Sequence, residues 1–456
     1  MSVGEDRISE LSDALLLHIL SFLPTKSVVS TCILSKRWRY LYTSIPILDF
    51  REWRSPFSSP VSTSSKEDCL LNTKKFMNFL DRLLLSPLHY HQHDVIIQKF
   101  CLSCDNFFDK SRVIDWISTL LIRRKVEELS LSIYIKDFMF PPCFFTCETL
   151  TMLELEMQVI LNLPKSISFP RLKILRLKYI MFVDDKLTER FFSNCPVLEE
   201  LILTQCSWMG LENFCISAPA LKRLIINGSL FAFPGLYEVC VIKIYAPNLL
   251  SLECIDAVPK DYVLLHSFSS LVDANIDCGS RGTSEERRFS VSKLIAGLSN
   301  VKLLKMSGNT FEALYFAGDL LTYLPKFYNL IRLEVSSQFS CETGRPLLDF
   351  LHISPNLESL VFTQGLNGNL SNGDPVWAEN LVPECLLLHL KAVEFREFHG
   401  KLRELNVIKF FLKNSRILER MTILSSSTLS TIDKNKVVEK LVKFPRGSTS
   451  CEVNFS

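Results

Sequence analysis

A short hydrophobic pattern recurs along most of the chain. It consists of an apolar residue, two intervening residues, a second apolar residue, one intervening residue and a third apolar residue. The first copy starts at Ile97 and the thirteenth at Leu418, with successive starts 22 to 33 residues apart. All 39 template positions are apolar if one Cys and one Ala are included, whereas only 11 of the 39 intervening positions are apolar. This contrast indicates an internal repeat.

The end of each copy alternates with period two, which predicts a short strand with one buried face. The first apolar residue of the copy enters the same core from the preceding turn. No copy can bury its apolar face alone, so we expect the copies to stack as leucine-rich repeats do, into a curved solenoid with a parallel sheet. Pro196, Pro219 and Pro247 precede strands and suit turns that enter such a sheet. A stack of amphipathic helices is the alternative, and the period-two alternation fits it less well.

The segments between the predicted strands differ in length and in pattern. Residues 185–194 and 402–412 have helical spacing, and residues 68–86 predict a helix that caps the start of the array. Residues 278–288 are polar and contain two glycines, so they predict an inserted loop.

The first fifty residues have a different pattern. Leucines at helical spacing follow Ser12, a good N-cap, and Pro24 ends this helix. Thr25 and Ser35 are predicted to cap a second and a third short helix. A three-helix module of about 40 residues buries only a modest core. It carries more apolar residues than that core can hide, so we expect it to pack on a partner or on the array.

This module resembles the F-box. The resemblance rests on the run from Asp13 to Pro24 and on the basic-Trp cluster from Ser35 to Arg39; Ser12 departs from it, because the family often has Pro there. The family docks on the Skp-type adaptor of a cullin–RING ubiquitin ligase. The resemblance implies that the residues facing the adaptor are Leu16, Ile19, Leu20, Leu23, Pro24, Val28 and Val29, with Leu34, Lys36 and Trp38 as further candidates. The alternative is that half of this set forms the module's own core.

The C-terminal region is similar to the FBD domain, which accompanies F-box and leucine-rich-repeat segments in plant proteins. The similarity covers residues 375–446, including Pro375-Val376-Trp377, and spans the last two strand patterns with a helix between them. We expect it to continue and close the array as a cap. The predicted domains are an F-box at 5–50, a linker at 51–66, a capping helix at 67–94, repeats at 95–370 and an FBD domain at 375–446. The expected fold class is therefore α/β: a small three-helix F-box, an irregular leucine-rich-repeat solenoid and an FBD cap.

Composition narrows the possible functions. An apolar share of 47% in 456 residues excludes wholesale disorder, and a net charge of +2 argues against binding nucleic acid or an anionic membrane. Only 15 residues are Gly, which disfavours nucleotide-binding folds. Fifteen scattered Cys fit a reducing compartment. The first ten residues are too charged for a signal peptide, and no apolar run is long enough to span a membrane. We therefore expect a protein of the nucleus, the cytoplasm or both.

Catalytic and metal-binding motifs are not found. The sequence contains no phosphate-binding loop, no nucleophile elbow and no zinc-protease motif. The nearest metal-like cluster combines His89, His91 and His93 with Cys101 and Cys104, but Cys101 falls within a strand pattern. A ligase with a catalytic Cys is the enzyme alternative, and no thiol is singled out for it. We expect no metal, no cofactor and no catalytic residue.

The exposed strand positions suggest where a substrate protein binds. The intervening positions of the copies hold ten basic and eleven acidic residues. Most are expected to be solvated, and an anion pocket is not expected because opposite charges alternate. The candidate substrate contacts are Lys173, Arg176, Glu199, Glu200, Lys222 and Arg223. The sequence thus predicts a non-catalytic substrate-recognition subunit of a ubiquitin ligase. The alternatives are an interaction scaffold outside a ligase and an enzyme of unrecognised type.

Overall fold

The chain forms two compact units, Met1–Leu201 and Ile202–Ser456. The computed structural model describes residues 8, 10–38, 41, 45–51, 53, 66–85, 97–158, 160–208, 210–228, 240–256, 261–264, 268–279, 285–315, 324–336, 344–365 and 382–456. None of the described helices is long and apolar enough to cross a membrane.

The first unit begins with short helices, α1 (Asp13–Leu20), α2 (Thr25–Ser30) and η1 (Thr31–Ile33). Ser12 occupies the N-cap position of α1 but makes no capping hydrogen bond through its side chain. The prediction that Thr25 caps the second helix is wrong, because Pro24 holds the N-cap position. The Thr25 hydroxyl instead accepts a hydrogen bond from the Asp49 amide at 2.7 Å, which ties α2 to the first strand.

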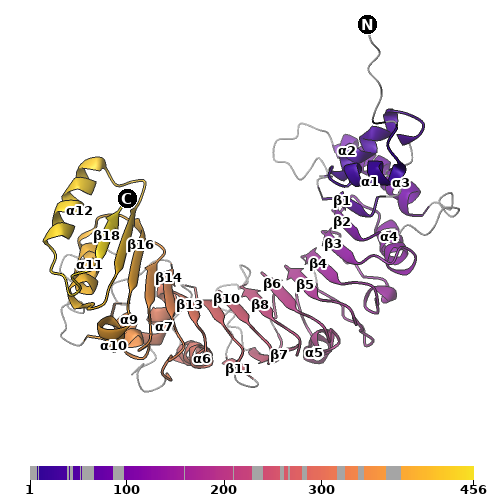
Figure 1. The fold of residues 1–456 in the computed structure, drawn as a ribbon. Coiled ribbons are helices and arrows are strands. Elements are labelled where there is room, and N and C mark those ends of the chain that lie inside the picture. Colours follow the sequence, from indigo (N-terminus) through magenta and orange to yellow (C-terminus); the bar gives the residue numbers. More distant parts are fainter. Residues whose placement is uncertain are drawn as a thin grey trace, which may run out of the picture. The chain divides into compact units, whose positions relative to one another are not determined.

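A parallel sheet in sequence order follows these helices (Figure 1). Its strands in the first unit are β1 (Ile47–Phe50), β2 (Lys99–Cys104), β3 (Glu128–Ile133), β4 (Met152–Met157) and β5 (Ile174–Lys178). Neighbouring strands are in register, so that Leu131, Leu155 and Leu177 stack as one row. All three are at most 1% exposed. Alternate residues of each strand therefore face one common core, as the period-two pattern predicts.

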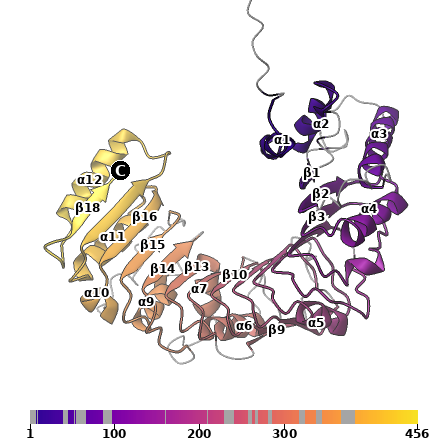
Figure 2. The same cartoon turned by 45° about the vertical axis from the view of Figure 1, so that its right-hand side comes forward.

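Helices cover the core side of this sheet: α3 (Lys66–Leu84), α4 (Lys110–Ile122), η5 (Pro142–Phe144) and α5 (Asp185–Ser193) (Figure 2). Helices α3 and α4 are joined through Asp81, whose carboxylate accepts a hydrogen bond from the buried Trp116 indole at 2.8 Å. Arg112 pairs with the same carboxylate at 2.5 Å. One acid thus satisfies the polar atom of the largest side chain in this part of the core.

The second unit repeats this arrangement. Strand β6 (Glu200–Thr204) straddles the boundary between the units. The parallel strands after it are β8 (Arg223–Asn227), β10 (Ser251–Ile255), β12 (Asp273–Asp277), β13 (Leu303–Ser307), β14 (Arg332–Ser336), β15 (Ser359–Phe362), β16 (Ala392–Phe398), β17 (Arg420–Ser425) and β18 (Glu452–Phe455). A second, three-stranded parallel sheet is made of β7 (Asn213–Ser217), β9 (Val241–Tyr245) and β11 (Asp261–Leu264).

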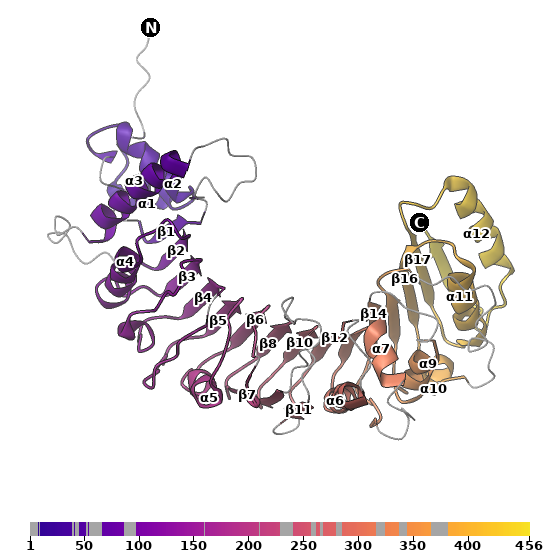
Figure 3. The ribbon, with the colours of Figure 1, turned by 180° about the vertical axis from the view of Figure 1, so that it is seen from behind.

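The helices of the second unit lie on one side of its strands, and the last of them lies near the C-terminus of the chain (Figure 3). They are α6 (Glu285–Ala296), α7 (Gly308–Tyr315), α9 (Gly344–His352), α10 (Glu384–Leu388), α11 (Leu402–Asn414) and α12 (Thr431–Lys443). The prediction of a loop over residues 278–288 is wrong for the last four residues, because α6 starts at Glu285. The buried residues that pack this helix on the core, Val291, Leu294 and Ile295, come after the polar stretch that suggested a loop.

The repeat prediction is confirmed strand by strand. Each of the thirteen patterns corresponds to a strand, from β2 to β17, and the fold is the predicted α/β array behind N-terminal helices. The helices predicted at 185–194 and 402–412 are α5 and α11. Strand β16 pairs with β15 and β17, so the C-terminal region continues the sheet of the second unit.

The flanking strands β1 and β18 and the second sheet were not predicted. Two strands of the second sheet carry the alternation of the main repeat, with Phe214 and Ile216 in one and Ile242 and Ile244 in the other. Leu211 and Val239 stand three positions before the first residue of these pairs, so both strands have the complete pattern. They lie between the copies that start at Leu198, Leu221 and Leu249, in stretches that were interpreted as connections.

Candidate partner-binding surfaces

The N-terminal module has a small core of its own. Six buried residues form this cluster: Leu16, Leu20, Val28, Trp38, Leu41 and Ile45. Four of them, Leu16, Leu20, Val28 and Trp38, belong to the ten residues predicted to face an adaptor. Because their side chains are at most 7% exposed, they support the partner-binding surface from below rather than form it.

The other six predicted residues are accessible. Ile19, Leu23 and Leu34 are 45%, 43% and 64% exposed. Pro24 and Lys36 are also exposed, and Val29 is half-buried. No measurement on the molecule tests partner contact for any of the ten, so the set stays a prediction.

Three further apolar side chains are exposed beside them. Leu15, Phe22 and Ile33 are 51%, 74% and 84% exposed, and the resemblance did not single them out. Leu15 and Ile19 are four residues apart on α1, so they share one side of the helix. Hydrogen bonds from Phe22 to Ile19 and from Leu23 to Leu20 continue the helical path beyond its end. An exposed apolar surface of this extent on one small module is typical of a docking site.

A cross-link keeps this module compact. The Arg37 guanidinium donates to the Asp13 carboxylate at 2.6 Å and 2.9 Å, which joins the segment after η1 to the first turn of α1. Asp13 also lies where a negative charge favours the start of a helix. The basic-Trp cluster that suggested the family therefore has two structural roles here, since Arg37 clamps α1 and Trp38 fills the core.

The second candidate surface is the open face of the first unit's strands, defined as the side chains of β1 to β5, with Glu200 at the start of β6, that point away from the core. Its charges are paired between neighbouring strands. Arg176 contacts Glu200 at 2.8 Å, Lys178 contacts Glu156 at 3.2 Å, and Lys99 contacts Glu128 at 3.2 Å. Such half-exposed pairs contribute little to stability. They leave a nearly neutral, strongly polar face.

The predicted substrate-face residues divide into two groups. Arg176, Glu200 and Arg223 are strand residues of the open faces. The prediction that all six are strand positions is wrong for Lys173, Glu199 and Lys222, because each lies just before its strand. The physical reason is the hydrogen bonding of the turn, in which the Lys173 carbonyl accepts from the amides of both Glu199 and Glu200.

The most connected cluster of the open face was missed. The Tyr134 hydroxyl donates to the Glu156 carboxylate, which also receives Lys178, and the Lys178 ammonium lies 4.9 Å from the centre of the Tyr179 ring. Burial and this hydrogen bond raise the pKa of Tyr134. A sequence signal was available, because Glu156 and Lys178 occupy the position after the last apolar residue of the pattern, which has the same parity as the open face.

Strand β1 adds a charged pair to the same face. Arg51 donates to both carboxylate oxygens of Asp49 at 3.1 Å. Burial alone would raise the pKa of Asp49, but the hydrogen bonds and charge of Arg51 outweigh it and lower that pKa. The sequence analysis did not single out Asp49 or Arg51, because strand β1 was not predicted.

The suspected metal cluster is not assembled in the part of the chain that can be examined. Among the described residues no three His, Cys, Asp or Glu side chains are placed to hold a metal ion, and His89, His91 and His93 lie outside those residues. Cys101 and Cys104 are buried. All fourteen cysteines in the described ranges are free thiols.

Cys101 should react slowly with alkylating reagents. Burial raises the pKa of this thiol from 9.0 to about 11, so only about 0.1% is thiolate at pH 8. We expect iodoacetamide at pH 8 to modify the half-buried Cys143 at least about tenfold faster than Cys101, as measured by peptide mass spectrometry. The rate at Cys101 should rise about tenfold per pH unit below its pKa. In urea the two rates should converge, and fast reaction of Cys101 in the native protein would contradict this assignment.

Comparison with known proteins agrees with these observations. The F-box domain model matches residues 8–47, a model described as the LRR repeats of FBD-associated F-box protein At5g56370 matches residues 114–262, and the FBD model matches residues 379–423. The chain is 33% identical to F-box/LRR-repeat protein At4g14096 of Arabidopsis thaliana, over 97% of this chain and 92% of that protein. It is 29% identical to F-box/FBD/LRR-repeat protein At5g56420 of the same plant, over 99% of both chains. It is 32% identical to the putative F-box/FBD/LRR-repeat protein At3g59240, over 98% of this chain and 89% of that protein.

Proposed function

Because the chain belongs to the plant F-box/LRR-repeat proteins that carry a C-terminal FBD domain, we propose that it is the substrate-recognition subunit of a Skp–cullin–F-box ubiquitin ligase. The F-box binds the Skp-type adaptor, and through it the cullin–RING ligase. The repeats and the FBD domain bind a target protein. The chain itself acts as a non-catalytic adaptor.

The observation that carries this proposal is the division of the apolar F-box side chains into buried and exposed ones. Leu16 and Leu20 complete a core, and Ile19 and Leu23 remain exposed on a folded module. This module has a packed core and still exposes apolar side chains. We expect it to bind a partner, because burying apolar surface is favourable by about 25 cal/mol per Å². We propose that Leu15, Ile19, Phe22, Leu23, Pro24, Ile33 and Leu34 form the adaptor contact.

The mechanism is proximity. A target held by the repeats and a conjugating enzyme recruited through the adaptor are joined in one assembly, so target lysines meet the activated ubiquitin at a raised effective concentration. This role requires only binding surfaces and no nucleophile from the chain.

We propose that the target is a protein that contacts the open face of the first unit. Paired charges such as Arg176 with Glu200 offer hydrogen-bonding groups of both signs, which suits a folded polar surface better than a polyanion. The contacts to examine on this face are the cluster around Glu156 and four residues named from the sequence, Lys173, Arg176, Glu199 and Glu200. The other two, Lys222 and Arg223, belong to the second unit and are proposed as separate contacts. Free thiols throughout the described ranges support a location in the nucleus or cytoplasm.

A reconstituted assay tests the proposal. The purified full chain should capture a purified Skp-type adaptor and, with cullin, RING subunit and conjugating enzyme, should support ubiquitin transfer to a captured target. Targets come from affinity capture with the proteasome blocked, in which the wild type is compared with an Ile19→Asp variant. Failure to bind any such adaptor contradicts the proposal. Adaptor binding without cullin recruitment or transfer identifies instead an interaction scaffold that acts outside a ligase.

A further inference from the structure

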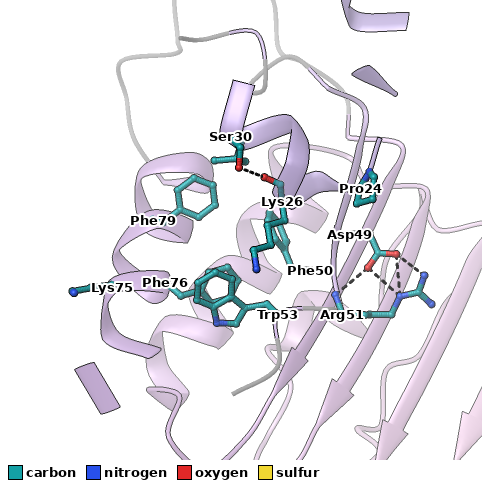
Figure 4. Close-up of a pocket in the computed structure, with 11 residues that line it drawn as sticks. Pro24, Lys26, Ser30, Asp49, Phe50, Arg51, Trp53, Lys75, Phe76 and Phe79 are labelled. Atoms are coloured by element: carbon teal, nitrogen blue, oxygen red, sulfur yellow. Dashed lines mark hydrogen bonds and ion pairs between the residues drawn. The ribbon is translucent and has the colours of Figure 1, made fainter. Parts of the chain in front are cut away.

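A cavity of about 860 Å³ lies within the first unit between α2, β1 and α3 (Figure 4). Its volume falls in the range of small-molecule sites in proteins. The apolar part of its wall is formed by Pro24, Val29, Phe50, Trp53, Phe76 and Phe79. The three walls come from elements that are 16 or more residues apart in the chain and are held together by the Thr25–Asp49 hydrogen bond and by aromatic packing.

The aromatic side chains form a rigid, layered wall. Trp53 stacks on Phe76 with ring centres 4.1 Å apart and planes inclined by 9°. Phe50 meets Phe76 edge to face at 5.6 Å, and it meets Phe79 at 6.2 Å with an interplanar angle of 76°. Aromatic rings pack favourably in both of these geometries. Such a wall offers both faces and edges to a further flat, apolar ring.

The polar part of the wall holds three cations, Lys26, Arg51 and Lys75, together with Ser30 and Asp49. Figure 4 shows the Lys26 side chain extending between Phe79 and Phe50 toward Trp53, whereas Lys75 points away from the cavity. The third cation, Arg51, is neutralised by Asp49 through contacts of 3.1 Å. Among the described residues no carboxylate pairs with the Lys26 ammonium. In the described part of the chain, Lys26 thus brings to the aromatic wall a positive charge that has no carboxylate partner.

We propose that this cavity binds a small planar aromatic anion, such as an aromatic carboxylate. The ring stacks on the Trp53–Phe76 wall, and the carboxylate accepts a charge-assisted hydrogen bond from Lys26. An uncharged ligand of the same shape gains the stacking but not the charged hydrogen bond. This inference concerns the cavity alone and does not rest on the proposed ligase role.

The test uses a matched pair of probes, 2-naphthoate and the uncharged 2-naphthamide, titrated into the full chain by calorimetry. We expect one naphthoate per chain and binding at least about tenfold tighter than that of the amide. Lys26→Met should remove this preference, since Met is an unbranched side chain only one heavy atom shorter and carries no charge. Lys74→Met is the matched control, because Lys74 is exposed on α3 next to Lys75 and does not line the cavity. It should preserve the preference.

A second variant locates the ring. Phe79→Ala removes a half-buried wall side chain and should weaken both probes by about the same factor, with folding checked by circular dichroism. The proposal is overturned if the wild-type chain binds neither probe. It is equally overturned if Lys26→Met and Phe79→Ala both bind naphthoate like the wild type, because the probe then lies on another apolar surface.

Discussion

Ile19→Asp should weaken binding of a Skp-type adaptor by about thirtyfold or more while leaving the fold intact. Ile19 is 45% exposed on α1, so the free module accommodates a carboxylate there without burying it. At an apolar interface the same carboxylate loses its water and has no partner, and truncating or charging a central interface residue typically changes binding by 2 kcal/mol or more, roughly thirtyfold upward. Affinity by calorimetry and unfolding by circular dichroism should be measured on the same preparations.

Two matched variants make the result interpretable. Ile122→Asp places the same charge at a position that is 62% exposed at the end of α4, outside the F-box, and should leave adaptor binding unchanged. Leu20→Asp should also abolish binding, but it buries a charge in the core of the module and should unfold it. If Ile19→Asp and Leu23→Asp both bind like the wild type, the adaptor docks elsewhere and the proposed surface is wrong.

Leu155→Ala should destabilise the strands around β4 by about 3 kcal/mol, whereas Glu154→Ala, on the adjacent residue, should change their stability by less than about 1 kcal/mol. Leu155 is fully buried between Leu131 and Leu177 in the stacked row of the first unit. Removing it leaves a hole that close-packed neighbours cannot fill. Glu154 lies on the open face, where it accepts one hydrogen bond from Ser130 at 3.0 Å.

Hydrogen exchange is the suitable measurement for this pair, because a stack of repeats can open locally without unfolding as a whole. A loss of about 3 kcal/mol corresponds to exchange about 150-fold faster in β3, β4 and β5. Strands of the second unit that are remote in the stack, such as β16 and β17, provide the internal reference. Equal effects of the two substitutions would contradict the assignment of core and open face.

Much of the fold could be predicted because its signal is local. A residue such as Leu155 is identified as core by its neighbours at plus or minus two, and thirteen copies of that alternation supply the strands and their parallel order. Strand β1 has the same pattern, from Ile45 through Leu48 to Phe50, but these residues fall inside the segment assigned to the F-box, and so Asp49 and Arg51 were not singled out. The start of α6 escaped for a related reason, since its buried residues follow the polar stretch.

The candidate sites were harder to predict than the fold. A helical stripe shows that Leu16, Ile19, Leu20 and Leu23 lie broadly on one side, but it does not show where the core ends and the surface begins. That boundary depends on what packs against the helix, and here Trp38, Leu41 and Ile45 cover only part of the stripe. The cavity under α2 had no sequence signal, because Lys26, Phe50 and Phe76 come from three separate segments.

The sequence by itself determined the repeat, the F-box and FBD regions and the near-balance of charge, since each is written in the type and spacing of neighbouring residues. Only the tertiary structure decided which F-box leucines are covered and which remain accessible, which charges of the open face are paired, and that aromatic residues from distant segments surround one lysine. The physical reason is that the burial of a side chain and the pairing of a charge depend on which distant segments pack against it. The local pattern of residue types does not contain that information.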